Sequence, residues 1–196
     1  MYAESVSLLT DRLAARLDPA APRATGDGGR RAAVAVVLHD ESAGPRVLLM
    51  KRADREGDPW SGHISLPGGR FEPTDPDLHA TAIRETYEEL TIDLAGTRLL
   101  GQLAPLHPRT SGPNGIEVTP FVFVTASAVE PVCGPEAIAA FWLPLEIAAS
   151  GALDGVYTYP GTGMQFPSWT FEGHVIWGLT MRILNDVLDT AAGAPP

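Results

Sequence analysis

The chain has 196 residues, of which 44% are apolar and 19% are charged, enough for one domain with a proper core. The formal net charge is −10 and no basic face is visible, which argues against a nucleic-acid-binding protein. The single cysteine, Cys133, excludes an internal disulfide and a cysteine-rich zinc site.

The N-terminal part predicts a short helix followed by an arm. Residues 7–17 place Leu9, Leu13 and Leu17 on one helical stripe, and residues 19–31 are rich in Pro, Gly and Arg. This region has no signal-peptide pattern, and no run of about 18 apolar residues occurs in the chain. We therefore expect a soluble, cytoplasmic protein that does not contact a membrane.

Short apolar runs separated by turn-forming residues predict a series of strands. Strands are expected over residues 32–38, 47–51, 98–106 and 116–126, and strand ends within residues 141–149 and 169–171. The first two runs flank a short turn, so they are predicted to pair with each other. A Gly- and Pro-rich loop is expected at residues 55–70.

Two longer helices are predicted from apolar residues at helical spacing, one over residues 78–90 and one over residues 175–188. A short helix is expected at the end of residues 141–149. Strands mixed with well-separated helices favour an α/β sandwich. No repeat and no domain boundary is visible, so residues 1–196 are predicted to form a single domain.

Three glutamates share one face of the predicted 78–90 helix. Glu85, Glu88 and Glu89 are related by i, i+3 and i+4, and no lysine balances them, although Arg84 can reach Glu88 at i+4. Such a cluster suits a hard cation such as Mg²⁺ or Mn²⁺, which prefers oxygen ligands and can activate a water near a diphosphate. A merely acidic, solvated face is the alternative, and the carboxylates alone do not decide between the two.

The opposite face of this helix is predicted to pack on a sheet through Ile83, Thr86, Tyr87 and Leu90. The helix is preceded by the turn Leu66-Pro67-Gly68-Gly69, in which glycines allow backbone carbonyls to approach a metal ion.

The spacing of these groups resembles the Nudix box. That pattern reads Gly, five residues, Glu, seven residues, and then Arg-Glu-apolar-x-Glu-Glu-x-Gly-apolar. Gly69 and residues 84–92 match most of it. The resemblance implies a Nudix-type α/β/α sandwich with a mixed β-sheet between helices, and a box helix over about residues 77–91.

The resemblance also implies roles for individual residues. Glu85, Glu88 and Glu89 would bind Mg²⁺ or Mn²⁺, Gly68 would offer its carbonyl to the metal, and Arg84 would orient the glutamates through charge-assisted hydrogen bonds. One of the glutamates would activate the attacking water, unless Glu136 does so.

The box departs from the family pattern in two places. It is one residue longer, with Asp75 at the position of the first Glu, so that Asp75 and Glu72 both remain candidates for that role. The glycine after the helix is Thr91. A left-handed cap is unfavourable for a β-branched residue, so the helix is expected to end in another way.

A second resemblance, to coenzyme A diphosphatases, covers roughly residues 34–188. It rests on residues 48–53, Gly62, the 66–69 turn and the extended box, and on residues 118–122, Glu136, Phe141, residues 144–145 and residues 176–180. Met50 and Leu66 differ from this pattern, and Gly57 stands at the position of its second Arg.

This second resemblance implies hydrolysis of coenzyme A or acyl-CoA to phosphopantetheine and adenosine 3′,5′-bisphosphate. The alternatives are a broader pyrophosphatase acting on ADP-ribose or NADH, and a non-catalytic nucleotide sensor. In each case the expected partner is a small-molecule nucleotide. Enzymes of this kind are commonly homodimers, so a homodimer is among the expected assemblies.

Several residues outside the helix are candidates for the site. Glu136 is either an additional catalytic carboxylate or a surface residue, and Arg52 is predicted to contact phosphate. Gly69 and Arg109 complete the predicted substrate-binding set, although a solvated role is the simpler interpretation for Arg109.

The aromatic residues are mostly assigned to packing. Trp60 and Trp169 could stack on an adenine, but packing is the favoured interpretation for both. Trp142 and Trp177 lie in apolar runs and are predicted to be core residues, and His63 is predicted to be a hydrogen-bonded structural residue.

Overall fold

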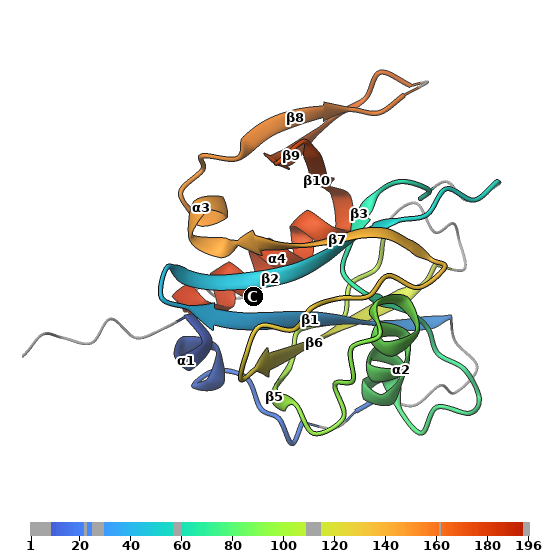
Figure 1. Ribbon diagram of the computed structural model, residues 1–196, viewed down its shortest axis with the longest axis vertical. Coiled ribbons are helices and arrows are strands. Elements are labelled where there is room, and N and C mark those ends of the chain that lie inside the picture. The colour runs from blue at the N-terminus through green and yellow to red at the C-terminus, as the bar shows by residue number, and fades with distance from the viewer. Residues whose placement is uncertain are drawn as a thin grey trace, which may run out of the picture.

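The computed structural model describes residues 9–21, 23–24, 30–56, 60–108, 115–160 and 162–193. Four helices and ten strands occur within these residues (Figure 1). The helices are α1 (Leu9–Ala14), α2 (Leu78–Leu90), α3 (Leu145–Ala149) and α4 (Gly178–Ala192). The strands are β1 (Arg31–Glu41), β2 (Gly44–Arg52), β3 (Ile64–Ser65), β4 (Gly68–Arg70), β5 (Arg98–Gln102), β6 (Glu117–Thr125), β7 (Ala137–Pro144), β8 (Asp154–Thr158), β9 (Gln165–Phe171) and β10 (His174–Trp177).

The central sheet is mixed. Its main path runs β3-β2-β1-β6-β5, with β4 paired to β1 and β7 paired to β2. Strands β1 and β6 are parallel, with Ala35 opposite Phe121, and β1 and β2 form the antiparallel pair that the sequence predicts. Strand β5 stops at Gln102, short of the predicted end, and Leu106 makes only an isolated bridge to Val118.

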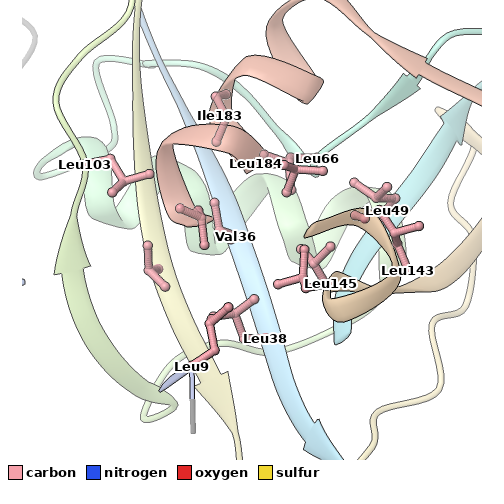
Figure 2. Packing of buried hydrophobic residues seen from close by; sticks show 14 of the residues in the cluster. Leu9, Val36, Leu38, Leu49, Leu66, Leu103, Leu143, Leu145, Ile183 and Leu184 are labelled. Carbon is pink, nitrogen blue, oxygen red and sulfur yellow. The ribbon is translucent and has the colours of Figure 1, made fainter. Parts of the chain in front are cut away.

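Strand β1 is apolar on both of its faces because helices cover both sides of the sheet. Val36 and Leu38 belong to the cluster that α1, α3 and α4 close, and Figure 2 shows Val36 on the side of Ile183 and Leu184 of α4 and Leu38 nearer to Leu9 of α1. Ala33, Ala35 and Val37 belong to a second cluster, which α2 closes. A fully buried Val or Leu stabilises a fold by about 1.5–3 kcal/mol. The predicted α/β/α sandwich is therefore confirmed.

The C-terminal region differs from its prediction. Residues 174–177 form β10, and the last helix begins only at Gly178. Val175 pairs with Thr170 of β9, and β-branched Val175 and Ile176 suit a strand better than a helix start. Gly178 has a φ of 62°, which separates the strand from the helix. Strands β8, β9 and β10 form a separate antiparallel sheet, of which the sequence predicts only a strand end at residues 169–171.

Helix α2 has the predicted extent but a different end and a different buried face. It begins at the cap Asp77, whose carboxylate accepts the Ala80 N–H at 2.8 Å. It ends at Thr91 in the left-handed conformation, with φ 56°, so the expectation of another ending is wrong. That conformation costs roughly 1–2 kcal/mol. Two hydrogen bonds offset the cost, from the Thr91 N–H to Tyr87 O at 2.8 Å and from the Thr91 hydroxyl to Val132 O at 3.1 Å.

The expected packing face of α2 is only partly correct. Thr86 and Leu90 are buried, but the Tyr87 side chain is 56% exposed. Glu89 is 1% exposed instead, because the helix turns this side chain toward the Gly68-Gly69 turn. No helix in the described part of the chain is long and apolar enough to cross a membrane.

Candidate active site

The Gly68-Gly69 turn brings backbone directly against the glutamate face of α2. Both glycines lie in β4, opposite Val34 and Ala33 of β1. A Cβ on Gly68 would lie 2.3 Å from the Ala33 carbonyl oxygen, and a Cβ on Gly69 would lie 2.4 Å from the Glu85 carboxylate. A side chain at Gly68 would collide with the backbone of β1, and a side chain at Gly69 would displace the Glu85 carboxylate.

Glu89 is the most deeply buried carboxylate at this turn. Its carboxylate accepts the Gly68 N–H at 2.8 Å. Burial raises the pKa of Glu89 to about 8, although the Gly68 hydrogen bond opposes the rise. The negative charges of Glu85 and Glu136 raise this pKa further, and the positive charge of Arg52 lowers it. The site thus holds more negative charge than its own cations balance.

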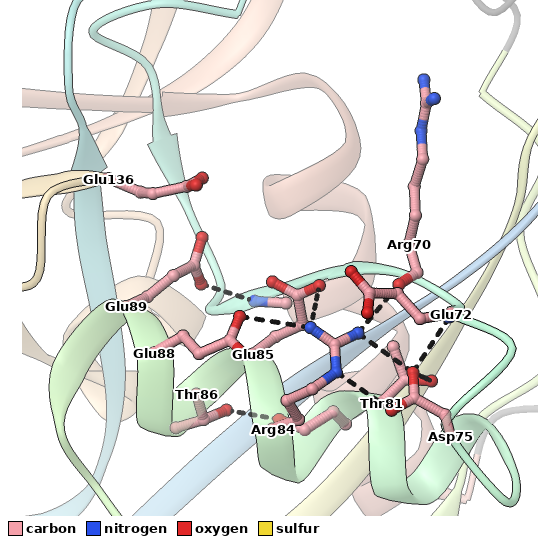
Figure 3. A network of polar contacts seen from close by, with 12 residues as sticks. Arg70, Glu72, Asp75, Thr81, Arg84, Glu85, Thr86, Glu88, Glu89 and Glu136 are labelled. Atoms are coloured by element: carbon pink, nitrogen blue, oxygen red, sulfur yellow. Dashed lines mark hydrogen bonds and ion pairs between the residues drawn. The ribbon is translucent and has the colours of Figure 1, made fainter.

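Arg84 links the remaining carboxylates into one network, which Figure 3 shows. Its Nη1 donates to Glu85 at 2.9 Å and to Glu88 at 3.2 Å. Its Nε and Nη2 donate to the two oxygens of Asp75 at 2.9 and 3.0 Å. Such paired, charge-assisted bonds fix both the position and the plane of the guanidinium. The predicted contact of Arg84 with the glutamates is present in this arrangement.

The network also decides between the two candidates for the first box carboxylate. Asp75 is buried and accepts hydrogen bonds from Arg84, from the Thr81 hydroxyl at 2.9 Å and from the Glu72 backbone N–H at 3.0 Å. The Glu72 side chain is exposed. Burial opposes ionisation of Asp75, but the hydrogen bonds from Arg84, Glu72 and Thr81 together lower its pKa. Asp75 is therefore the residue that holds Arg84 in place.

Two candidates from other elements border these carboxylates. Arg52, at the end of β2, is close enough to lower the pKa of Glu89. Glu136 precedes β7 and lies beside Glu89, on the side away from Arg84 (Figure 3). Its carboxylate pairs with Arg55 at 2.9 Å, and both side chains are about half exposed. Arg55 is absent from the sequence-based candidates because no motif marks it and its partner lies far along the chain.

A known protein family matches most of this chain. The family model described as NUDIX domain matches residues 29–159, more than half of the chain. The chain belongs to the Nudix family. It is 33% identical over 160 residues to the "Uncharacterized Nudix hydrolase NudL" of Yersinia pestis (strain Pestoides F), a match that covers 80% of this chain and 77% of that protein. The same identity and coverage are found for NudL of Yersinia pseudotuberculosis serotype O:1b (strain IP 31758).

Solved structures agree on the Nudix fold. An Ap4A hydrolase from C. elegans has a TM-score of 0.56 at 19% identity, covering 84% of this chain and 98% of that one. RenU, a Nudix hydrolase from M. smegmatis, has the same TM-score at 14% identity, covering 84% and 87%. Together with the family match, the fold makes this chain a hydrolase of the Nudix type.

Nudix hydrolases generally depend on a divalent cation, and the chemistry of this donor set fits one. Glu85, Glu88 and Glu89 offer hard oxygen atoms in a partly dehydrated place. Arg84 holds the carboxylates of Glu85 and Glu88. Within the described residues, no three acidic, His or Cys side chains are grouped so that they could hold a metal ion. A cation would favour the ionised form of Glu89, whose pKa is raised mainly by burial.

The remaining candidates are Arg109 and the residues with aromatic rings. Arg109 lies outside the described residues, so its predicted contact with substrate stays a prediction. Trp169 is 3% exposed and packs in the core, whereas Trp60 is 40% exposed. Trp177, predicted as a core residue, is only partly buried, because it ends the edge strand β10 and borders a cavity. His63 lies beside it, with ring centroids 5.2 Å apart.

Proposed function

We propose that this chain hydrolyses coenzyme A or acyl-CoA to phosphopantetheine and adenosine 3′,5′-bisphosphate. One observation carries the proposal. Three segments that resemble coenzyme A diphosphatases lie far apart in the sequence but border the same carboxylates. They are the end of β2 with Arg52, the turn at residues 66–69, and the start of β7 with Glu136.

The proposed cofactor is Mg²⁺ or Mn²⁺, held by Glu85, Glu88 and Glu89 with the Gly68 carbonyl as a further donor. When bound, such an ion neutralises phosphate charge and lowers the pKa of a nearby water. Arg84 already holds two of the three carboxylates, which supports its role in aligning them. Gly69 carries no side chain, so the Glu85 carboxylate can lie directly against its backbone, and Gly69 is proposed as a substrate contact beside this carboxylate.

In the proposed reaction a water oxygen attacks one phosphorus of the diphosphate. The anhydride P–O bond breaks, its electron pair leaves with the second phosphate, and the water proton passes to a carboxylate. Glu136 or one of the box glutamates accepts that proton. Arg52 binds a phosphate oxygen and stabilises the charge that develops on it, since guanidinium groups match phosphate geometry. Arg109 is proposed as a second phosphate contact.

A second candidate function is a broader pyrophosphatase that acts on ADP-ribose or NADH. It is favoured by Gly57, which stands where the coenzyme A pattern has a second Arg. A non-catalytic nucleotide sensor is less well supported, because Glu85, Glu88 and Glu89 are all retained.

The two functions are separated by a hydrolysis assay of the purified protein with Mg²⁺ and then Mn²⁺. Coenzyme A, ADP-ribose, NADH and a nucleoside triphosphate are compared at equal concentration. Preference for coenzyme A with release of adenosine 3′,5′-bisphosphate would support the first proposal. Preference for ADP-ribose or NADH would replace it with the second, and tight nucleotide binding without turnover would favour a sensor.

We further propose that residues 1–196 form one domain. The described part of the N-terminal region supports this, because Leu9 and Leu13 of α1 are buried in the same cluster as Ile183 and Val187 of α4. Limited proteolysis would test it, and separate release of a stable fragment lacking α1 would contradict it.

A further inference from the structure

Partly buried aromatic side chains gather around Trp177, on the far side of β2 from the glutamates. The ring of Tyr157 lies 4.4 Å from that of Trp177, and those of His63, Phe166 and Tyr159 lie 5.2, 5.3 and 5.8 Å away. All five rings are partly open to solvent. Tyr157, Phe166 and Trp177 belong to β8, β9 and β10, Tyr159 follows β8, and His63 precedes β3. The group therefore brings together distant parts of the chain.

A cavity of about 200 Å³ lies against this group. Its lining includes Lys51, His63, Tyr157, His174 and Trp177, with glycines between them. Pockets that hold a whole ligand measure roughly 300–1,000 Å³, so this one suits a single ring system. The rings supply flat apolar faces, and Lys51 supplies a positive charge at the same place. We name this cavity the aromatic pocket.

The aromatic pocket and the carboxylate site share the end of β2. Side chains alternate along this strand: Leu49 belongs to the α4-side cluster and Met50 to the α2-side cluster. Lys51 lines the aromatic pocket, while Arg52 acts on Glu89, and the pairing of β2 with β7 shifts its register between these two residues.

The two sites are also joined through the chain that follows β2. The Arg52 N–H donates to the His63 carbonyl at 3.0 Å, and the Thr180 hydroxyl at the start of α4 donates to Ile64 O at 3.0 Å. From His63 to Gly68 the chain can span at most about 17 Å. The separation of His63 and Gly68 is therefore no greater than the length of an extended nucleoside diphosphate derivative.

We propose that the aromatic pocket binds the nucleobase of the substrate, stacked against Trp177, with Lys51 attracting a phosphate of the same nucleotide. This inference rests on the proposed function, in which the substrate is a nucleoside diphosphate derivative held by its phosphates at the glutamates. A nucleobase is planar and stacks on aromatic side chains, and its attached phosphates are anionic. In a chain of net charge −10, a lysine inside a pocket is a local attraction for such a ligand.

The test measures binding without turnover. Adenosine 5′-monophosphate and ribose 5-phosphate carry the same phosphate and sugar, but only the first has a base. Calorimetric titration in the absence of divalent cations should show that the wild-type protein binds the first roughly tenfold or more tightly than the second. Equal affinity for the two would overturn the proposal.

Substitutions in the aromatic pocket test whether the preference for the base-containing ligand arises there. Trp177→Leu and Tyr157→Ser should each reduce the difference between the two ligands severalfold, and Lys51→Met should weaken binding of the nucleotide. Ile147→Ser is the control, because Ile147 lies on α3, is 42% exposed and does not line the aromatic pocket. If circular dichroism shows that Trp177→Leu is unfolded, Tyr157→Ser decides the test. Unchanged discrimination in a folded Tyr157→Ser variant would overturn the proposal.

Hydrolysis measured on the same preparations keeps the two proposals apart. Turnover of coenzyme A without preference for the base-containing ligand would overturn the aromatic pocket alone. Preference for that ligand without turnover of any diphosphate would overturn the proposed function, and would leave a base-binding pocket.

Discussion

Both faces of the central sheet bury large apolar side chains, but only the α2 face also carries buried carboxylates in the described part of the chain. On the α4 side, β1 and β2 contribute Val36, Leu38 and Leu49 to a cluster of aliphatic groups. On the α2 side, a second apolar cluster is bordered by the buried carboxylates of Asp75 and Glu89. Apolar burial stabilises the fold on both faces, whereas burial of these carboxylates keeps charged groups in an environment that raises their cost.

The buried carboxylates indicate that the functional site lies on the α2 face of the sheet. A carboxylate such as Glu89, 1% exposed and with a pKa raised to about 8, weakens the metal-free fold at neutral pH. Such a group is typical of a site selected for chemistry, since perturbed pKa values cluster at functional sites. Mutations on the two faces should therefore separate stability from activity.

The largest effect is expected for Glu89→Gln. It should lower kcat by at least about 100-fold, because a metal ligand loses its charge, while the amide oxygen can still accept the Gly68 N–H. Circular dichroism should show an unchanged fold. Steady-state kinetics with Mg²⁺ measure the loss, and activity near that of the wild type would remove Glu89 from the proposed site.

On the opposite face, Leu184→Ala should cost about 2–5 kcal/mol of unfolding free energy, because the side chain is fully buried in the α4-side cluster. Urea denaturation measures this cost. The folded fraction should keep a kcat within about threefold of the wild type, since the residue is distant from the charge network. A large loss of kcat with little loss of stability would contradict the separation of the two faces.

Asp75→Asn tests the support of Arg84. The neutral amide cannot accept two charge-assisted bonds from the guanidinium, so Glu85 and Glu88 should be held less firmly. We expect a fall in kcat of about tenfold and a loss of about 1.5–3 kcal/mol of stability. Glu72→Gln is the matched control and should change neither, because its exposed side chain takes no part in the network.

The pH dependence of stability should sharpen the contrast further. Burial raises the pKa of Glu89 from its ordinary value of 4.5 to about 8, so the folded state favours the protonated form. The stabilisation from this group is fully present below pH 4.5 and is lost as the pH rises toward 8. Metal-free Glu89→Gln should therefore lose less stability than the wild type between these values in denaturation experiments. Parallel curves for the two proteins would contradict the assignment.

The smallest effect is expected for Thr91→Gly. Glycine removes the cost of the left-handed cap but also removes the hydroxyl bond to Val132 O, so the two changes nearly cancel. A net gain of about 0.5 kcal/mol, measured by thermal denaturation, is expected. A loss above about 1 kcal/mol would show that the Thr91 hydroxyl contributes more than the strain costs.

The sequence predicts those parts of the molecule that depend on local spacing. Helix α2 and its row of glutamates follow from i, i+3 and i+4 positions, and the β1–β2 pair follows from two apolar runs around a turn. Thr91 was expected not to adopt a left-handed cap because its propensity opposes it, and the contact that supports it comes from residue 132. Tertiary contacts of this kind are not visible in one sequence.

The parts that the sequence does not predict depend on distant partners. Arg55 and Glu136 are 81 residues apart, and His63 is 94 residues from Tyr157 and 114 residues from Trp177. Residues 175–177 were predicted to begin the last helix, but they pair with β9 and form a strand. The periodicity of apolar residues predicts which side chains face the core, whereas pairing with a neighbouring strand determines whether the segment is a strand or a helix.

The central claim is that the box glutamates bind a divalent cation, and titration with Mn²⁺ tests it most directly. Calorimetry or electron paramagnetic resonance should show Mn²⁺ binding to the wild-type protein and a loss of at least about tenfold in affinity in Glu85→Gln and Glu89→Gln, with Glu72→Gln unchanged. Equal Mn²⁺ affinity in the wild type and in both box variants would contradict the account.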